Sequence, residues 1–360
     1  MRLGIIGLPQ AGKTTIFNAL TGSDRPVGPG SGRFEVNTAV VPVPDPRVDR
    51  LSAMFNPRKT IYAQVTYADI AGLSGESDKT GLSGPLLNQL ATMDGLLQVV
   101  RAFEDPTVPH PAGAVDPRRD LAVLDGELLL NDMLAVERKL ERLDEDLRKG
   151  IVKDKAMHGL ELALFRRLQA ALGAEQPLRD LDLAPAEEKL LASYQLLTRK
   201  PMLVVFNVGE GGAGLDLPAY PHTRSGVVAL QGQLEMEIAQ LAPDEAAAFL
   251  QEYGIAEPSR FRVIRLSYDL LGLESFFTVG EDEVRAWTVR RGATAPEAAG
   301  EIHTDLQKGF IRAEVAAYAE LIAAGGLNEL KAKGKLRLEG KDYVVQDGDI
   351  VHVRFSPPAK

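Results

Sequence analysis

Residues Gly7 to Thr14 read G-L-P-Q-A-G-K-T, which is the complete signature of a phosphate-binding loop. The apolar segment 2–6 before it is typical of a buried strand, and residues 15–20 after it have apolar positions at helical spacing. In a strand–loop–helix unit, backbone N–H groups converge on phosphate oxygens and the helix dipole favours negative charge. We therefore expect a nucleotide site in which Lys13 reaches the β and γ phosphates and acts in catalysis, while the Thr14 hydroxyl binds Mg²⁺. The residues expected around the phosphates are Gln10, Ala11, Gly12, Lys13, Thr14 and Thr15.

A second motif of phosphate-binding proteins follows the apolar segment that ends at Ala68. Residues 69–72 read D-I-A-G, the D-x-x-G pattern. An Asp at the end of a strand can hold Mg²⁺ through water, and the Gly N–H can contact the γ-phosphate. We expect these roles for Asp69 and Gly72. The alternative is an ordinary strand-to-loop turn, because Asp and Gly are common turn residues.

A third motif, Asn207-Val208-Gly209-Glu210, stands where a GTPase carries Asn-Lys-x-Asp and reads the base. Glu210 is one methylene longer than the Asp that accepts two N–H groups of guanine, and Val208 replaces the Lys that packs along the base. A site built for hydrogen bonds discriminates strongly, so misplacing its acceptor removes the preference for guanine. We expect Asn207, Val208 and Glu210 to line a site for ATP, with GTP as the alternative ligand. The competing interpretation is that Asn207 and Glu210 only cap a turn.

The order of predicted elements indicates an α/β fold with an insertion. Strand-like apolar runs occupy residues 39–43, 65–69, 96–100, 202–206 and 226–230. Between the third and fourth runs, apolar residues at 4-3-4-3-4 spacing predict a coiled-coil seam, and a second stripe predicts a helix that returns beside it. The first stripe is Leu129, Met133, Val136, Leu140, Leu143 and Leu147, and the second is Met157, Leu160, Leu164 and Leu168.

The C-terminal part has a different pattern, with short strands predicted at residues 276–280, 284–289 and 343–353 and a helical stretch around 302–323. The chain is therefore predicted to fold as three parts. A P-loop nucleotide-binding domain comprises residues 1–126 and 200–275. An antiparallel helical hairpin is inserted at residues 127–199. A small α+β domain occupies residues 276–357, within the usual size of a domain.

Composition limits the classes of function. A chain of 360 residues exceeds one ordinary core, and the absence of cysteine excludes disulfides and thiolate chemistry. No apolar run is long enough to span a bilayer and no basic leader precedes the first strand, so we expect a cytoplasmic protein without a membrane partner. A monomer is also expected, although no residue pattern indicates the oligomeric state. The net charge of −9 argues against an extended DNA-binding surface.

Two local basic clusters remain as candidates for contacts with RNA phosphates, or as ordinary solvated loops. They are Arg148, Lys149, Lys153 and Lys155 at the predicted hairpin tip, and Lys331, Lys333, Lys335, Arg337 and Lys341 near the C-terminus.

Taken together, several motifs resemble those of the Obg-related YchF family. Besides the three motifs above, the resemblance rests on V-V-P-V-P-D-P-R at residues 40–47, R-A-F-E at 101–104, V-D-P-R-R-D at 115–120 and the ending V-Q-D-G-D-I-V-H-V-R-F at 345–355. It covers essentially the whole chain. It implies a C-terminal TGS domain and an ATP-hydrolysing protein associated with the ribosome in translation or stress response. The expected contacts are with ribosomal RNA, through the hairpin tip and the TGS domain.

Two departures from the family pattern suggest a divergent paralogue. Arg33 stands where the family has a Thr that binds Mg²⁺, and the phosphate loop has Gln10-Ala11 in place of Asn-Val.

Leu73 occupies the position of the glutamine that orients the attacking water in Ras-type enzymes, and an aliphatic side chain cannot hydrogen-bond water. The resemblance implies His110 as the group that replaces it. On the residues alone, the interpretation of His110 as an exposed loop histidine is the favoured one.

Two main functional classes follow from these residues. The first is an ATPase switch with slow intrinsic hydrolysis that the ribosome stimulates. The second is a nucleotide-gated binding module with negligible hydrolysis, favoured by Leu73 and by Arg33 at the position of the metal-binding Thr. A GTP-binding protein is the third alternative.

Overall fold

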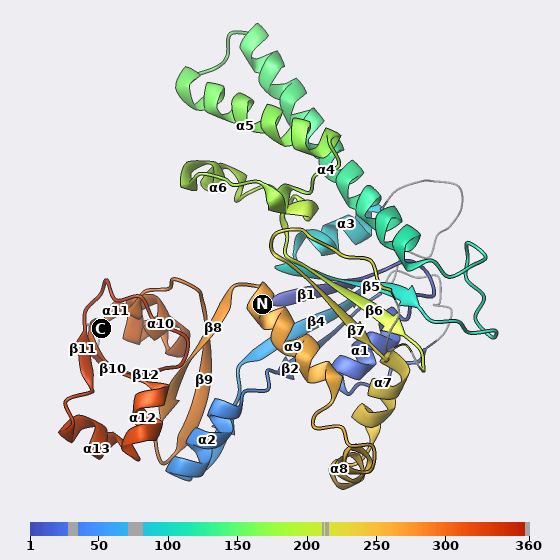
Figure 1. Ribbon diagram of the computed structural model, residues 1–360. Coiled ribbons are helices and arrows are strands. Elements are labelled where there is room, and N and C mark those ends of the chain that lie inside the picture. The colour runs from blue at the N-terminus through green and yellow to red at the C-terminus, as the bar shows by residue number, and fades with distance from the viewer. Residues whose placement is uncertain (28–34, 71–81, 211, 213–215, 357–360) are drawn as a thin grey trace. The chain divides into compact units, whose positions relative to one another are not determined.

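The computed structural model describes residues 1–27, 35–70, 82–210, 212 and 216–356. The chain divides into two compact units, coloured along the chain in Figure 1. Unit 1 comprises Met1–Ala39 and Thr66–Val263, and unit 2 comprises Val40–Val65 and Ile264–Lys360. Unit 2 is therefore larger than the predicted C-terminal domain, because residues 40–65 and 264–275 join it.

Unit 1 is built on a sheet whose central strands are parallel, in the order β2-β4-β1-β5-β6-β7. Every residue of β5 and β6 is buried, which explains the continuous apolar runs in their sequences. The structure thereby confirms the predicted α/β fold and its strand-like runs. The strands are β1 (Arg2–Ile6), β2 (Val36–Pro42), β4 (Gln64–Ile70), β5 (Gly95–Ala102), β6 (Met202–Val208) and β7 (Ser225–Leu230).

Helices connect these strands. Helix α1 starts at Lys13, directly after the phosphate loop, and packs against α7. Helix α9 crosses the boundary between the two units in sequence. The helices outside the hairpin are α1 (Lys13–Thr21), α3 (Gly84–Ala91), α6 (Pro185–Leu191), α7 (Gly232–Gln240), α8 (Pro243–Glu252) and α9 (Ser259–Leu270), with short 3₁₀ turns η1 (Leu178–Asp180) and η2 (Leu197–Arg199).

The inserted hairpin consists of α4 (Pro117–Arg148) and α5 (Lys155–Gly173). Helix α4 begins ten residues before the predicted boundary at 127 (127 − 117 = 10), because its first turns pack on the core of the sheet through Leu121, Leu124 and Leu128. The helix then continues without a break into the hairpin (Figure 1). Asp116 caps its start by accepting the N–H groups of Arg118 and Arg119.

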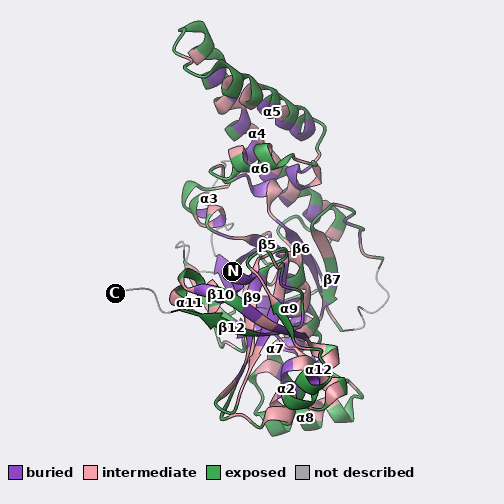
Figure 2. Cartoon of the chain, turned by 90° about the vertical axis from the view of Figure 1, so that its left-hand side faces the viewer, coloured by how far each residue is buried: buried purple, intermediate pink, exposed green. Residues whose placement is uncertain are grey.

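The predicted seam of the hairpin is packed only in part. Val136 and Leu140 on α4 are buried against Leu164 and Leu168 on α5, and Lys139 pairs with Glu161 across the two helices. Leu143 is buried as well, whereas the seam positions nearest the tip are exposed, and Figure 2 shows exposed residues over much of the end of the hairpin. These exposed positions are Leu147, Met157 and Leu160. The two helices thus share a core near the sheet but not at their tip.

Unit 2 contains a second sheet, with the strand order β11-β10-β12-β8-β9-β3. Its strands are β3 (Lys59–Ile61), β8 (Leu273–Val279), β9 (Glu283–Arg290), β10 (Phe310–Ala317), β11 (Arg337–Glu339) and β12 (Asp349–Phe355). Its helices are α2 (Pro46–Phe55), α10 (Ala295–Ile302), α11 (Thr304–Lys308), α12 (Tyr318–Ala324) and α13 (Leu327–Ala332).

Two predicted elements of this unit were wrong. The stretch 302–323 contains the strand β10 rather than a continuous helix, since β10 pairs with both β11 and β12 and buries Phe310, Ala313 and Val315. The alanine-rich sequence hid this strand, because helix propensity gives way to pairing within a sheet. The predicted strand 343–353 begins only at Asp349, after a turn in which Gly348 has φ +90°.

Residues 40–65 are held in unit 2 through a motif that sequence reasoning had placed in the nucleotide domain. Arg47 donates two hydrogen bonds to Asp347, at 2.7 and 3.2 Å, and its guanidinium lies 5.1 Å from the ring centre of Phe277. Strand β3 pairs with β9, which adds a backbone attachment. The D-P-R turn of residues 45–47 therefore has a packing role in this unit. Among the described residues, no helix combines the length and apolar character needed to cross a bilayer.

Candidate nucleotide site

The phosphate loop adopts a backbone that few residue types allow. Gly12 has φ +89°, and Gln10 has φ +61°, which is uncommon for a residue with a side chain. A Cβ at Gly12 would lie 2.2 Å from Nδ2 of Asn207, and a Cβ at Gly7 would lie 2.5 Å from the carbonyl oxygen of Val99. Both glycines are therefore required by close approach. The loop is packed against β5 and β6 beside its own strand.

Lys13 folds back over this loop. Its Nζ donates to the carbonyl oxygens of Gly7 and Leu8, both at 3.0 Å. Burial lowers the pKa of Lys13 to about 8, although the negative charge of Asp69 acts in the opposite direction. A buried ammonium whose hydrogen bonds go to carbonyl oxygens is poised to bind a multiply charged anion. The expected role of Lys13 at the phosphates stays a prediction.

Thr14 and Asp69, the two expected Mg²⁺ residues, are brought together. The Thr14 hydroxyl donates to Oδ2 of Asp69 at 2.9 Å. Asp69 is 3% exposed, and its Oδ1 is buried with no hydrogen-bond partner among the described residues. Burial raises the pKa of Asp69, while the Thr14 hydrogen bond and the charge of Lys13 lower it.

This pair fits a small divalent cation. Mg²⁺ prefers oxygen ligands and keeps several waters or phosphate oxygens, so one hydroxyl and one carboxylate suffice from the protein. The unpartnered Oδ1 of Asp69 is a buried acceptor that a metal-bound water would satisfy. In the described part of the chain there is no cluster of three or more His, Asp or Glu that offers a metal site made of protein ligands alone.

Asn207 braces the site rather than pointing freely at a base. Its Nδ2 donates to the carbonyl of Ala11 at 3.2 Å, and its Oδ1 accepts the N–H of Gly232 at 3.1 Å. The side chain thus joins the phosphate loop to the N-terminus of α7. A Cβ at Gly232 would lie 2.6 Å from Oδ1 of Asn207, so this approach also requires glycine.

The rest of the base motif divides between buried and exposed positions. Val208 is 6% exposed and belongs to the core of the sheet, so its side chain is not available to pack along a base. Glu210 is exposed. Phe103, which sequence reasoning did not select, lies beside this segment, because a Cβ at Gly209 would be 3.3 Å from Cβ of Phe103. Arg101 stacks over the Phe103 ring at 4.5 Å and donates to the carbonyls of Phe103 and Val108.

His110 is not an exposed loop histidine. Its side chain is 5% exposed and its Nε2 lies 2.8 Å from Oδ2 of Asp120 in the first turn of α4. Its Nδ1 accepts the N–H of Ala112 at 3.1 Å. Asp120 lies in one of the motifs that carry the family resemblance, but the sequence did not predict its contact with His110. Three further residues of the sequence motifs, Arg33, Gly72 and Leu73, lie outside the described residues.

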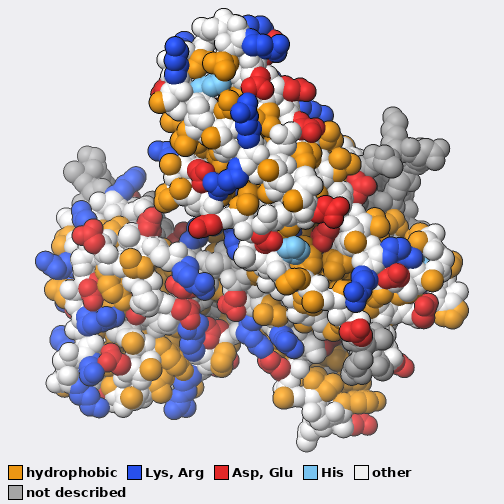
Figure 3. Space-filling model, turned by 45° about the horizontal axis from the view of Figure 1, so that its top comes forward, with side chains coloured by type: hydrophobic (Ala, Val, Ile, Leu, Met, Phe, Trp, Pro, Cys, Tyr) orange, Lys and Arg blue, Asp and Glu red, His pale blue; other side chains and the backbone are white. Residues whose placement is uncertain are grey.

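The two basic clusters are exposed. Arg148, Lys149, Lys153 and Lys155 surround the end of the hairpin, where Figure 3 shows Lys and Arg side chains together with apolar ones. Lys149 pairs with Glu145 of its own helix, and the side chain remains 60% exposed. In unit 2, the lysines at 331, 333, 335 and 341 and Arg337 lie on and after α13, and Lys335 pairs with Glu320. Neither cluster is neutralised as a whole by these pairs.

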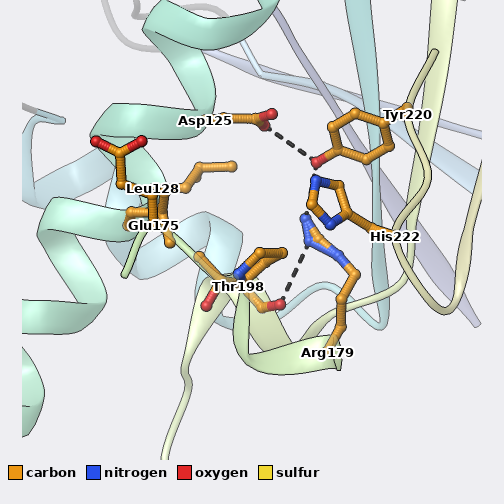
Figure 4. Close-up of a pocket in the computed structure, with 9 residues that line it drawn as sticks. Asp125, Leu128, Glu175, Arg179, Thr198, Tyr220 and His222 are labelled. Carbon is orange, nitrogen blue, oxygen red and sulfur yellow. Dashed lines mark hydrogen bonds between the residues drawn. The ribbon is translucent and has the colours of Figure 1, made fainter. Parts of the chain in front are cut away.

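A small pocket lies at the foot of the hairpin (Figure 4), and none of its lining residues belongs to the phosphate loop. It encloses about 280 Å³ including its open mouth. Tyr220 donates to Asp125 of α4 at 3.2 Å, and Arg179 donates to the hydroxyl of Tyr220 at 3.1 Å. These contacts tie α4 to the segments before β6 and β7. The pocket is a structural junction of the hairpin, separate from the nucleotide site.

A parallel sheet with a phosphate loop after its first strand, and with Thr14 paired to Asp69, defines a P-loop nucleotide-binding protein. Residues 2–125 match the family model described as a 50S ribosome-binding GTPase, and residues 273–356 match the YchF-GTPase C-terminal model, described as a protein of unknown function. The chain belongs to the YchF family.

Relatives similar to this chain extend over its whole length. The ribosome-binding ATPase YchF of Bacillus subtilis is 40% identical, covering 98% of each chain, and that of Haemophilus influenzae is 42% identical, covering 99% of each. The Obg-like ATPase 1 of Oryza sativa is 36% identical over 99% of this chain and 92% of its own. The solved structure of the Schizosaccharomyces pombe YchF GTPase superposes with a TM-score of 0.85 at 32% identity, covering 98% of this chain and 97% of that one.

Proposed function

We propose that this protein is a cytoplasmic, monomeric P-loop ATPase that acts at the ribosome. The observation that carries the nucleotide part is the cluster of Lys13, Thr14 and Asp69, in which a buried ammonium, a hydroxyl and an unpartnered carboxylate oxygen lie together at the phosphate loop. This set suits a triphosphate and Mg²⁺. Bound Mg²⁺ would neutralise charge that develops on the β and γ phosphates. The names of the relatives, ribosome-binding ATPases, support ATP hydrolysis and action at the ribosome.

In this proposal the chain's own residues bind and orient the triphosphate. Lys13 would exchange its two carbonyl partners for phosphate oxygens, and Thr14 and Asp69 would hold the metal. The N–H groups of residues 10–15 would surround the phosphates, while Gly72, expected from the sequence to contact the γ-phosphate, lies outside the described residues. His110 orients the attacking water once it is free to do so. Catalysis of this kind depends on positioning and charge rather than on covalent chemistry.

The base preference for ATP over GTP rests on three side chains. Glu210 replaces the Asp that would accept two guanine N–H groups, and Val208 is buried where a Lys stem would pack. Phe103 lies next to this segment, and since Arg101 stacks over one face of its ring, only the other face could meet a purine. An adenine base can use backbone groups at Val208 for its N1 and N6 positions.

The ribosomal contact is assigned to the hairpin tip and to the lysines of unit 2. Both clusters are exposed, and phosphate contacts by Lys and Arg supply most non-specific affinity for nucleic acid. No aromatic residue interleaves the tip cluster, so we expect recognition of RNA backbone and shape rather than of bases.

One observation favours the second candidate, a nucleotide-gated module with negligible hydrolysis. Both ring nitrogens of His110 are engaged, so the group proposed to orient water is not available in this conformation. Direct competition of ATP and GTP for the protein, followed by multiple-turnover assays of each, tests the proposal. Tighter ATP binding with measurable turnover supports an ATPase. Tight ATP binding without turnover, with or without ribosomes, supports the module, and a preference for GTP contradicts the base assignment.

A further inference from the structure

The loop that carries His110 is fastened to the first turn of helix α4 by one carboxylate. Asp120 is 4% exposed, and its two oxygens have different partners. Oδ2 lies 2.8 Å from Nε2 of His110, whereas Oδ1 accepts from Nη2 of Arg119 at 2.7 Å. Arg119 also donates to the carbonyl of Ala114 at 2.9 Å, which closes the loop onto the helix. Asp120 is thus the shared partner of His110 and Arg119.

The hydrogen bonds of the imidazole define its tautomer. Nδ1 of His110 accepts the N–H of Ala112 at 3.1 Å, and Nη2 of Arg119, also a donor, lies 3.5 Å from the same atom. A ring nitrogen that accepts N–H donors carries no proton, so the proton is on Nε2 and is donated to Asp120. Each nitrogen therefore has its partner within the protein. A water near the γ-phosphate could use neither of them.

We propose that Asp120 is a positioning residue that holds His110 in a resting orientation, and that hydrolysis requires His110 to leave it. This inference rests on the proposed role of His110 in hydrolysis. Two states of the loop follow, one docked on Asp120 and one released towards the nucleotide. The basal rate then reflects the small population of the released state, and anything that weakens the docked state raises that rate.

Helix α4 gives this contact a connection to the hairpin. It is continuous from Pro117 to Arg148, so Asp120 and the tip are joined by about 42 Å of helix at 1.5 Å per residue. Two more carboxylates of α4 accept hydrogen bonds from other segments of unit 1. Asp132 is fully buried and accepts the N–H groups of Leu197 and Thr198, and Asp125 accepts the Tyr220 hydroxyl (Figure 4). A partner that displaces the hairpin tip would move the helix that carries Asp120, and would thereby disturb the contact that holds His110.

The test compares Asp120→Ala with a matched variant of the same helix end. Asp116→Ala removes the cap of α4, which accepts from Arg118 and Arg119, but leaves the contact between His110 and Asp120 in place. Basal turnover of Mg-ATP is measured without ribosomes for both variants, for Asp120→Asn and for the double variant Asp120→Ala/His110→Ala. Asn can still accept the Nε2 proton, so it keeps the docked state in weaker form.

The proposal predicts that Asp120→Ala raises basal turnover on the order of tenfold, which is the factor expected from losing a hydrogen bond to a charged group. Asp120→Asn should raise it less, and Asp116→Ala should leave it near the wild-type value. The double variant should lose the gain, because the released group is His110. Ribosomes should stimulate Asp120→Ala by a smaller factor than the wild type. A fall or no change in basal turnover for Asp120→Ala would overturn the proposal, since Asp120 would then assist His110 or be irrelevant to it.

A second readout does not depend on turnover. Nitrogen NMR of the His110 ring should show the proton on Nε2 in the wild type and a mixture of tautomers in Asp120→Ala. A mixture already present in the wild type would overturn the docked state. If the wild type hydrolyses no nucleotide under any condition, the proposed function fails, while this spectrum still decides whether Asp120 holds His110.

Discussion

The hydroxyl of Thr14 donates a 2.9 Å hydrogen bond to Oδ2 of Asp69, although the two residues are far apart in the sequence. This contact joins the helix that follows the phosphate loop to the end of strand β4. The other carboxylate oxygen of Asp69 is buried, and no residue in the described part of the chain is its hydrogen-bond partner. Because a buried polar atom without a partner is costly, a cation bound beside it would complete the site.

The first prediction follows from this pair. Thr14→Val should weaken Mg²⁺ binding to the nucleotide complex by about tenfold or more, because a metal ligand is removed and Asp69 loses its hydrogen bond. Titration of Mg²⁺ against the ATP-bound protein measures the effect. Thr14→Ser keeps the hydroxyl and is the matched control, so it should bind Mg²⁺ nearly as well as the wild type. Equal Mg²⁺ affinity in all three proteins would remove Thr14 from the metal site.

The second prediction concerns protons and Lys13. Burial lowers the pKa of this ammonium to about 8, and bound phosphate would raise it again. ATP binding should therefore take up a fraction of a proton between about pH 8 and pH 10. Calorimetry at about pH 8.5, within this range, in buffers of different ionisation enthalpy measures this uptake. The side chain of Lys13→Arg stays charged throughout this range, so ATP binding to this variant should release or take up almost no proton at residue 13.

The same pKa has a consequence for stability. The folded-state pKa of Lys13 lies below that of an unfolded lysine, so the unfolded chain binds more protons between these two values. The free energy of unfolding should accordingly gain a stabilising contribution as the pH rises from about 8 to about 10.5, apart from the other groups that titrate there. Unfolding of wild type and Lys13→Met compared across this range isolates the contribution. An identical pH dependence in both proteins would contradict the lowered pKa.

The third prediction concerns the base. Glu210→Asp should shift preference toward GTP by about tenfold, because a correctly placed acceptor pair for guanine is worth about 1–3 kcal/mol. Competition binding of ATP and GTP measures the shift. Glu210→Gln has the original length without the charge, so it should not gain affinity for GTP. Val208→Lys would restore the lysine of the GTPase motif, but it is a poor test of base preference. Val208 is buried, and the new ammonium would disturb the core.

The fourth prediction concerns the hairpin tip. Replacing Lys149, Lys153 and Lys155 by Glu should weaken co-sedimentation with ribosomes and flatten its salt dependence, by roughly one unit of slope for each phosphate that the protein no longer neutralises. All three side chains are exposed, so folding should be preserved. ATP affinity is the internal control and should not change. The lysines at 331, 333 and 335 need the same replacement separately, and unchanged binding in both variants would contradict the RNA-contact assignment.

Sequence reasoning reached the parts of the fold that depend on local pattern. The phosphate loop, the buried strands and the helical hairpin each have a period or a motif that is visible in one stretch of chain. The partners of Asn207 and His110 could not be found in this way, because Ala11, Gly232 and Asp120 are brought to them only by folding. A motif identifies such a residue as important, but its neighbours depend on how distant segments pack.

The errors have the same origin. Strand β10 has an alanine-rich sequence that favours helix, and only its pairing with β11 and β12 makes it a strand. Arg47 belongs to a motif near the phosphate loop in sequence, yet its partner Asp347 is at the other end of the chain. The start of α4 was placed too late because its first turns pack on the sheet, where the coiled-coil spacing does not apply.

Ribosome-stimulated ATP hydrolysis at the phosphate loop is the property on which the proposed function depends. Steady-state turnover of Mg-ATP at increasing ribosome concentrations, with wild type and Lys13→Ala in parallel, tests it most directly. Lys13→Ala should remain folded, because among the described residues the Lys13 ammonium bonds to loop carbonyls and interacts with Asp69, and the variant should lose most of its ATP affinity. We predict a slow basal rate in the wild type that rises to a plateau with ribosomes, and no turnover above background in Lys13→Ala. A wild-type rate that stays flat as ribosomes are added, or equal turnover in the two proteins, would contradict this function.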